Sequence, residues 1–279
     1  MPLKVMTNNE AGCMVSFIYA GGETQMELMA SPAHYFEVTA RLQSAQDIIE
    51  LMMLNEVIDR VHPNATKCLK IPYMPYARQD RITQASRAFS LKVFAKIIND
   101  LKFDRVISYD LHSDVTSALI NNLTEVPQIF CMSTCTELRH EIQHGKIQAI
   151  VSPDAGAYKK ASAIANQFDV PLIIAVKARD TATGELSGQS ILSQEVPNSV
   201  LIVDDICDGG RTFIALANAL KLAGAEHISL YITHGIFSYG YSAFQGLIDH
   251  IYTTNTFTPK EYAAPNDIPV TINTLQEIE

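Results

Sequence analysis

The 279 residues suffice for two domains of ordinary size, and 47% hydrophobic with 18% charged residues excludes an intrinsically disordered chain. A formal net charge of -9 argues against a general nucleic-acid binder, and no apolar run approaches the roughly 18 residues of a membrane span. We therefore expect neither a nucleic-acid nor a membrane partner. The N-terminus lacks a charged-then-apolar signal segment, which predicts a cytoplasmic protein whose five cysteines are reduced.

The first half of the chain alternates short apolar runs with helical patterns. Apolar residues recur at three- and four-residue spacing from Leu42 to Val57, which is typical of one face of an amphipathic helix. Prolines stop the strand that follows, in a loop dense in Tyr and Arg that reads I-P-Y-M-P-Y-A-R-Q-D-R. The predicted elements are a strand over 14–19, a turn at 20–23, a helix over 32–60, a strand over 66–71, a helix over 90–101, a strand over 105–109 and a helix over 115–122.

The second half repeats the alternation of strand and helix. A polar stretch at 139–145 breaks the periodicity, so we place the boundary between two domains at 143/144. The tail after about 262 is expected to pack back on the N-terminal domain. The predicted elements are strands over 147–152, 171–176, 200–203, 228–232 and 270–272, a helix ending near 168, and a helix that starts at Thr212 and closes at Gly224.

The stretch 200–212, V-L-I-V-D-D-I-C-D-G-G-R-T, has the order of a ligand site in a parallel sheet. Four apolar residues predict a buried strand, and two adjacent carboxylates follow it at Asp204 and Asp205. Gly209 and Gly210 then allow successive N–H groups to converge on an anion at the start of a helix. This pattern predicts a phosphate cradle with an acid pair suited to sugar hydroxyls or Mg²⁺, although a solvated acidic turn would show similar residues.

Two earlier strands also end in acidic turns that lead into helices, at Asp110 and Asp154. Such junctions lie on one edge of a parallel sheet, where ligands collect. His112 lies between two carboxylates, which fits either a metal or phosphate contact or an ordinary surface histidine. The residues alone leave this choice open.

Five motifs, in order and spacing, resemble those of the ribose-phosphate pyrophosphokinase family. They are P-Y-A-R-Q-D-R, Y-D-L-H-S, V-S-P-D-A-G, K-A-R after a strand, and V-D-D-I-C-D-G-G-R-T. The resemblance implies an α/β protein with two domains of phosphoribosyltransferase-like fold, each a mainly parallel sheet flanked by helices. It also implies transfer of the pyrophosphoryl group of Mg-ATP to O1 of ribose 5-phosphate, with AMP as the second product.

The resemblance assigns roles position by position. It implies that Lys177 and Arg179 are catalytic cations of a mobile loop, and that Mg²⁺ is the cofactor. It further implies a homodimer or homohexamer with the active site near a subunit interface. The implied ligand residues are Tyr19, Glu23, Arg78 and Gln79 for ATP, Asp204, Asp205, Asp208, Gly209, Gly210, Arg211 and Thr212 for ribose 5-phosphate, and His112 and Asp154 for the metal.

This chain departs from the family pattern at several places, and two of them lie at the implied substrate sites. Its phosphate loop reads D-G-G-R-T where the family has D-T-A-G-T, so Arg211 stands in place of a glycine. Gly21 replaces the aspartate of F-x-D-G-E, which bears on adenine selectivity. Two other functions stay open from the sequence: a phosphoribosyltransferase that consumes the activated sugar, and a catalytically silent homologue that regulates an active synthetase.

Overall fold

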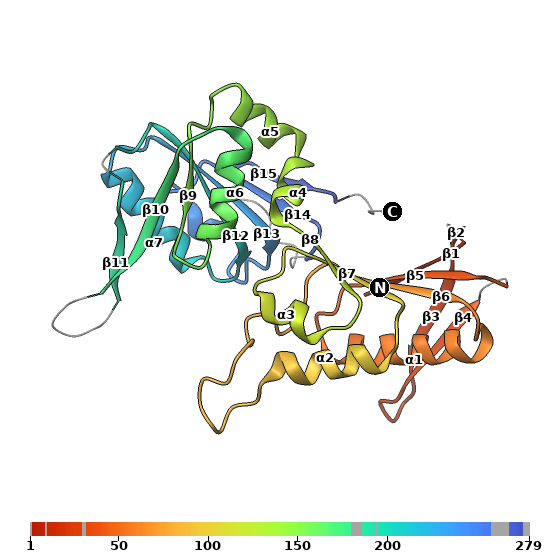
Figure 1. Ribbon diagram of the computed structural model, residues 1–279. Coiled ribbons are helices and arrows are strands. Elements are labelled where there is room, and N and C mark those ends of the chain that lie inside the picture. Colours follow the sequence, from red (N-terminus) through yellow and green to blue (C-terminus); the bar gives the residue numbers. More distant parts are fainter. Residues whose placement is uncertain are drawn as a thin grey trace. The chain divides into compact units, whose positions relative to one another are not determined.

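A computed structural model of the chain describes residues 2–8, 10–29, 32–179, 186–193, 195–257 and 268–275. The side chains of 177–179 and 186–189 lie outside this description. The chain divides into two compact units, Met1–Val126 and Pro127–Glu279 (Figure 1). Both are mixed α/β structures built mainly on parallel strands, which confirms the fold class that the motifs imply.

The described part of the first unit contains a six-stranded sheet in the order β2-β1-β5-β6-β7-β8. The pairs from β5 to β8 are parallel, whereas β1 pairs antiparallel with both β2 and β5. A separate antiparallel hairpin is formed by β3 and β4. The strands are β1 (Leu3–Thr7), β2 (Glu10–Ala11), β3 (Cys13–Ile18), β4 (Thr24–Met29), β5 (Tyr35–Ala40), β6 (Thr66–Ile71), β7 (Arg105–Tyr109) and β8 (Leu123–Val126).

Two long helices, α1 (Ala45–Val61) and α2 (Ser90–Asp100), lie along one side of this sheet, and α3 (Asp114–Leu119) follows β7 (Figure 1). Ser44 caps α1 in a reciprocal capping box, because its hydroxyl accepts from the Asp47 N–H and the Asp47 carboxylate accepts from the Ser44 N–H. Leu51 and Leu54 of α1 and Phe94 of α2 are buried in one hydrophobic core with strand residues.

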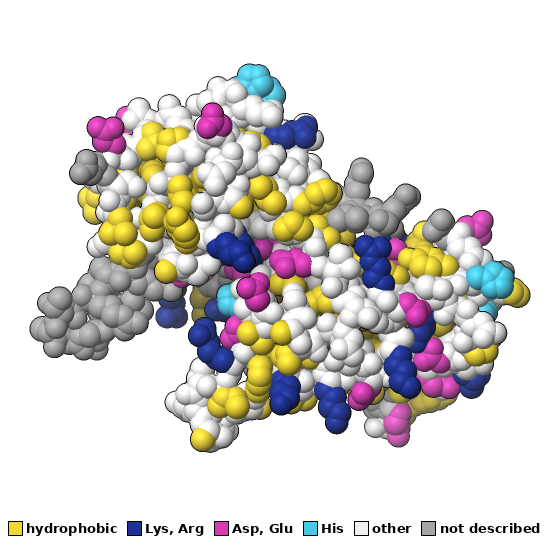
Figure 2. Space-filling view, in the orientation of Figure 1, with side chains coloured by type: hydrophobic (Ala, Val, Ile, Leu, Met, Phe, Trp, Pro, Cys, Tyr) yellow, Lys and Arg dark blue, Asp and Glu magenta, His cyan; other side chains and the backbone are white. Residues whose placement is uncertain are grey.

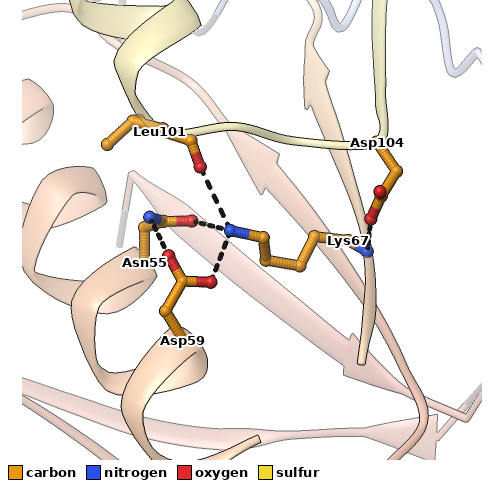
Figure 3. Close-up of polar contacts among 5 residues, drawn as sticks. All are labelled: Asn55, Asp59, Lys67, Leu101 and Asp104. Carbon is orange, nitrogen blue, oxygen red and sulfur yellow. Dashed lines mark hydrogen bonds and ion pairs between the residues drawn. The ribbon is translucent and has the colours of Figure 1, made fainter. Parts of the chain in front are cut away.

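A buried lysine ties α1 to β6 in this unit (Figure 3). The Lys67 ammonium donates to Asp59 Oδ1 at 2.5 Å, to Asn55 Oδ1 at 2.9 Å and to the Leu101 carbonyl at 3.1 Å. Its side chain is only 7% exposed, whereas that of Asp59 is 50% exposed. A buried cation is tolerated only when it is paired and hydrogen-bonded. The three acceptors of the Lys67 ammonium therefore offset the cost of its burial.

Replacing Asp59 with alanine should lower the free energy of unfolding by about 1–2 kcal/mol. The Lys67 ammonium would lose its carboxylate partner while staying buried, and water access at the half-exposed Asp59 position limits the cost. The matched control is Glu56→Ala on the same helix, because Glu56 pairs with Arg60 at the surface and should cost under about 0.5 kcal/mol. Equal losses in a denaturant titration of both variants would contradict the role assigned to Lys67.

The described part of the second unit contains a seven-stranded sheet in the order β11-β10-β9-β12-β13-β14-β15. Its pairs are parallel except for β10 with β11. The elements are α4 (Gln128–Ser133), α5 (Thr136–Gln143), β9 (Ala149–Ser152), α6 (Tyr158–Phe168), β10 (Leu172–Arg179), β11 (Leu186–Ile191), β12 (Ser199–Cys207), α7 (Arg211–Leu222), β13 (His227–Gly235), η1 (Ser242–Phe244), β14 (His250–Thr254) and β15 (Val270–Asn273).

Both faces of β12 are buried, because successive side chains of a strand point to opposite faces and all four residues of 200–203 are apolar. Val200 and Ile202 belong to a core shared with α7. Leu201 and Val203 belong to a second core shared with α4, α5 and α6. Packing on both faces therefore fixes the position of β12 up to Val203, where the acid pair follows.

The structure differs from the sequence prediction in the region 32–60. The predicted helix starts only at Ala45, and 35–40 is strand β5 at the middle of a sheet. Four of its six residues are buried, so the run lacks the alternation that marks a half-exposed strand. No predicted element covers the strands β1, β8 and β14 or the helices α4 and α5.

The two compact units meet at Val126/Pro127, earlier in the chain than the predicted domain boundary at 143/144. The polar stretch 139–145 lies mostly within α5, and α5 packs on the second unit. Tyr252 of β14 donates a hydrogen bond of 2.5 Å to Glu141. In the tail, β15 pairs with β14 of the second unit, and packing of the tail on the first unit stays a prediction. Residues 258–267 of that tail lie outside the description.

The surface carries mixed charge. Figure 2 shows Lys and Arg side chains interspersed with Asp and Glu over the drawn face, without one continuous basic area. Among the residues that the structure describes, no helix is both long and apolar enough to cross a membrane.

Candidate functional site

Two adjacent carboxylates, Asp204 and Asp205, lie in the last part of β12, which continues to Cys207 and so extends past the predicted strand over 200–203. Asp205 is 6% exposed, and its N–H donates to Asp204 Oδ1 at 2.9 Å. Burial raises the pKa of the Asp204 carboxyl well above its ordinary value, with further contributions from the charges of Asp205 and Asp154. The pKa of Asp204 therefore depends on two neighbouring carboxylates at this edge of the sheet.

The predicted phosphate cradle, residues 208–212, directly follows β12. Gly210 has φ +75° and immediately precedes α7, so the chain turns through a left-handed residue before the helix begins at Arg211. The first N–H groups of a helix have no intrahelical partner, and the helix dipole makes this end attractive to anions. Arg211 is exposed at this first position and adds a formal positive charge.

The glycines are also required by close packing. A Cβ at Gly210 would lie 2.5 Å from Cζ of Phe244, and one at Gly209 would lie 2.9 Å from the ring of Tyr239. The segment between β13 and β14, which carries Tyr239 and Phe244, therefore packs directly against the cradle. Any side chain at either glycine would push the cradle away from this segment.

Hydrogen bonds fix the same segment to the cradle. Ser238 Oγ donates to Asp208 Oδ1 at 2.6 Å, and the Ser238 N–H donates to the Asp208 carbonyl at 3.2 Å. The N–H groups of Ile236 and Phe237 both donate to the Cys207 carbonyl. Local sequence patterns do not predict this support, although T-H-G at 233–235 ends the neighbouring strand, directly before the supporting segment begins.

Asp154 lies at the end of β9, which pairs with β12 in the sheet. Its Oδ1 accepts from the N–H groups of Gly156 at 2.9 Å and Ala157 at 3.2 Å, so the carboxylate holds the turn into α6. Lys160, in the first turn of α6, reaches Asp205 Oδ2 with its ammonium at 3.4 Å. This lysine is absent from the sequence prediction, although it follows the P-D-A-G turn by one helical turn.

Lys177 and Arg179 lie on β10, the strand that pairs with β9 on the other side. Their backbone pairs with β11 in a ribbon that shifts register between Ala178 and Arg179. The side chains of both residues lie outside the description, so their catalytic role stays a prediction. The strand order nevertheless places β10, β9 and β12 as consecutive neighbours.

The first unit holds the other predicted site residues. Arg78 and Gln79 are exposed in the loop after β6, and exposed His112 follows β7, the parallel neighbour of β6. These positions share one edge of that sheet. The Asp110 junction belongs to the same sheet, so the expectation that it shares an edge with Asp154 and Asp204 is wrong. Asp110 is fully buried and has φ +40°, in the left-handed region that few residues other than glycine adopt.

Tyr19 and Glu23 are brought together at the tip of the β3–β4 hairpin. The Tyr19 N–H donates to the Glu23 carbonyl at 2.8 Å, and the Gly22 N–H donates to the Tyr19 carbonyl at 2.9 Å. The Glu23 carboxylate folds over Gly21, where a Cβ would lie 2.4 Å from it. Any side chain at Gly21 would therefore displace the Glu23 carboxylate.

We expect Asp204→Asn to raise the melting temperature at pH 7.5. The raised pKa means that the folded state binds the proton more readily than the unfolded state, so the ionised group destabilises the fold at neutral pH. The amide oxygen can still accept from the Asp205 N–H. The gain should shrink as the pH falls toward about 4, where the carboxyl is protonated in the folded state. A gain of the same size at both pH values in calorimetry would contradict this explanation.

Comparison with known proteins decides the family. A Phosphoribosyl transferase domain model matches residues 131–238. Ribose-phosphate pyrophosphokinase A of Dictyostelium discoideum is 30% identical over 267 residues, covering 91% of this chain and 81% of that protein. The ribose-phosphate pyrophosphokinase of Hyphomonas neptunium is 30% identical over 222 residues, covering 78% and 69%. The chain belongs to the ribose-phosphate pyrophosphokinase family.

Other members of this family match over a smaller share of their length. The ribose-phosphate pyrophosphokinase of Cereibacter sphaeroides is 32% identical over 198 residues, which span 69% of this chain and 56% of that protein. The crystal structure of phosphoribosylpyrophosphate synthetase from Mycobacterium smegmatis superposes with a TM-score of 0.75 at 21% identity, covering 94% of this chain and 86% of that one. This likeness agrees with the two-unit α/β fold.

Proposed function

We propose that the protein transfers the pyrophosphoryl group of Mg-ATP to O1 of ribose 5-phosphate, giving 5-phosphoribosyl 1-pyrophosphate and AMP. The observation that carries this proposal is the β12–α7 junction. In a chain that belongs to the ribose-phosphate pyrophosphokinase family, this junction has the acid pair Asp204 and buried Asp205 shortly before a glycine loop that leads into α7.

The sugar half of the reaction is assigned to the second unit. Asp204 and Asp205 accept from the 2- and 3-hydroxyls of ribose, because paired carboxylates suit a vicinal diol. The loop from Asp208 to Thr212 surrounds the 5-phosphate through backbone N–H groups at the start of α7. Arg211 adds a charge that the glycine of the family pattern does not supply.

The donor half is assigned to exposed residues of the first unit. Arg78 and Gln79 contact ATP, while Tyr19 and Glu23 at the hairpin tip reach the adenine bound to a neighbouring subunit. This arrangement fits a homodimer or homohexamer acting in the cytoplasm. Size-exclusion chromatography with light scattering tests the assembly, and a monomer at assay concentration with full activity would remove the neighbouring-subunit role.

The chemical step forms a bond between O1 of the sugar and the β-phosphorus of ATP and breaks the bond from that phosphorus to the α-phosphate oxygen. The proton of the sugar hydroxyl passes to the solvent, and AMP leaves with the oxygen that bridged the α- and β-phosphorus atoms. Negative charge grows on the β-phosphoryl oxygens and on the departing AMP. Lys177 and Arg179 are proposed to meet this charge as fixed cations, which favours the transition state over the bound substrates.

The residues fit Mg²⁺ as the cofactor. Mg²⁺ prefers oxygen ligands, keeps several waters, and is usually bound by one or two carboxylates together with substrate phosphates. Asp154 provides such a carboxylate, and the described residues hold no group of three or more His, Cys, Asp or Glu able to form a metal site by themselves. Carboxylate suits Mg²⁺ better than imidazole does, so Asp154 would be the main protein ligand and His112 a secondary one. The ion would neutralise charge on the ATP phosphates.

The nucleotide product tests the proposal. Incubation of the purified chain with ATP, Mg²⁺ and ribose 5-phosphate should yield AMP, with no AMP when the sugar is omitted. Formation of ADP would indicate an ordinary kinase. Consumption of 5-phosphoribosyl 1-pyrophosphate with a nitrogenous base would indicate a phosphoribosyltransferase, and no reaction in either assay would indicate a silent regulatory homologue.

A further inference from the structure

Lys160 stands out because its charge is unfavourable for its place in the fold. It lies in the first turn of α6, and the start of a helix attracts anions and disfavours cations. No acidic residue of that turn compensates it. The ammonium instead extends to the neighbouring strand end, where it lies 3.4 Å from Asp205 Oδ2.

The helix holds this lysine in a fixed position. Ala161, Ile164 and Ala165 of α6 are buried in the core that also contains Leu201 and Val203 of β12. The same packing therefore positions both partners of the ion pair. The Lys160 side chain is 27% exposed and that of Asp205 is 9% exposed, so the pair is only partly screened by water.

The acid pair needs such a cation in order to work as a hydroxyl acceptor. Adjacent carboxylates at a buried strand end repel each other, and Asp154 adds a third negative charge nearby. A protonated carboxyl would offer one acceptor oxygen fewer to a diol. A cation held on Asp205 offsets the repulsion and keeps its carboxylate from rotating.

We propose that Lys160 is a positioning residue that holds Asp205 for the ribose hydroxyls and so determines the affinity for ribose 5-phosphate. The inference rests on the proposed function only in that Asp204 and Asp205 are taken to bind those hydroxyls. Lys160 acts through Asp205 and takes no part in pyrophosphoryl transfer. It therefore belongs to the sugar half of the reaction alone.

The test compares Lys160→Met and Lys160→Arg with a matched control, Lys159→Met. Lys159 is the preceding residue on the same helix and is exposed. Removing a charge-assisted contact of this kind costs about 1.5–3 kcal/mol, so Lys160→Met should raise KM for ribose 5-phosphate about 10- to 100-fold. KM for ATP and kcat should stay within about threefold of the wild type, because uniform binding is what is lost. Lys160→Arg should restore most of the affinity.

A purely structural role gives a different pattern. It would lower the melting temperature and the fraction of active enzyme, so kcat would fall while KM for the sugar stayed unchanged. Equal KM values for Lys160→Met and Lys159→Met would overturn the proposal. If Lys160→Met does not fold, Lys160→Gln, which keeps a donor and most of the length, is measured in its place under the same criteria.

Calorimetric titration of ribose 5-phosphate separates this inference from the proposed function. If the wild-type chain forms no AMP, the proposed function fails, but binding of the sugar can still be compared between the wild type and the variants. Loss of that binding in Lys160→Met, with retention in Lys159→Met, would support the positioning role by itself. Unchanged binding in both variants would refute it.

Discussion

Replacement of Lys177 by alanine should lower kcat by about 10²–10³-fold, which corresponds to about 2.7–4 kcal/mol of lost transition-state stabilisation. The residue is proposed to meet charge that appears only as the β-phosphoryl group leaves AMP. Substrate binding should change little, because the interaction is weak before the transition state. Steady-state kinetics with both substrates varied measures the two effects separately.

The control for this variant is Lys146→Ala. Lys146 is 66% exposed on its side chain and pairs with Glu141 at 3.6 Å on the surface of the second unit, so its loss should leave kcat unchanged. If Lys177→Ala keeps wild-type turnover, the assignment of the catalytic cations is wrong. If Lys177→Ala raises KM for ATP and leaves kcat unchanged, Lys177 binds the substrate and the transition state equally well and is not catalytic.

The second large effect is expected at the cradle. Gly210→Ala should cost about 2–5 kcal/mol of folding stability, because two penalties add there. A residue with a Cβ at φ +75° is strained by about 1–2 kcal/mol, and the new Cβ would lie 2.5 Å from Cζ of buried Phe244. The loop must move to relieve the clash, so KM for ribose 5-phosphate should rise together with the loss in melting temperature.

Gly145 provides the matched control for this substitution. It has φ +70°, nearly the same backbone conformation, but no atom lies within 4 Å of the position its Cβ would take. Gly145→Ala should therefore show the strain alone, about 1–2 kcal/mol, with an unchanged KM. Equal effects at the two glycines would mean that the packing of Phe244 against the cradle has no importance for the site.

Much of the second unit could be predicted from residue patterns, because the first part of its central strand β12 is an apolar run that leads directly into an acid pair and a glycine pair. The run 200–203 is buried on both faces, and Gly210 is required by a left-handed turn. Both properties are local and leave a direct trace in the sequence. The same holds for β6 and β7, whose predicted bounds agree with the structure.

Other elements of the fold and of the site depend on contacts between distant segments, which local sequence patterns do not show. The helix prediction over 32–60 is wrong for β5, since a central strand with four of six residues buried lacks a period of two. The position of α5 depends on Tyr252 bonding Glu141, two residues far apart in the chain. The contacts of Lys160 with Asp205 and of Ser238 with Asp208 likewise join segments that only the sheet order brings together.

The most direct test of the account follows the phosphorus atoms of the reaction. Phosphorus NMR of a mixture of the chain, Mg²⁺, ribose 5-phosphate and ATP whose β-phosphoryl oxygens carry ¹⁸O should show the ¹⁸O label moving into a diphosphate attached to C1 of the sugar, while AMP forms in equal amount. Label that stays in ADP, or that appears as free pyrophosphate without the sugar product, would contradict pyrophosphoryl transfer to ribose 5-phosphate.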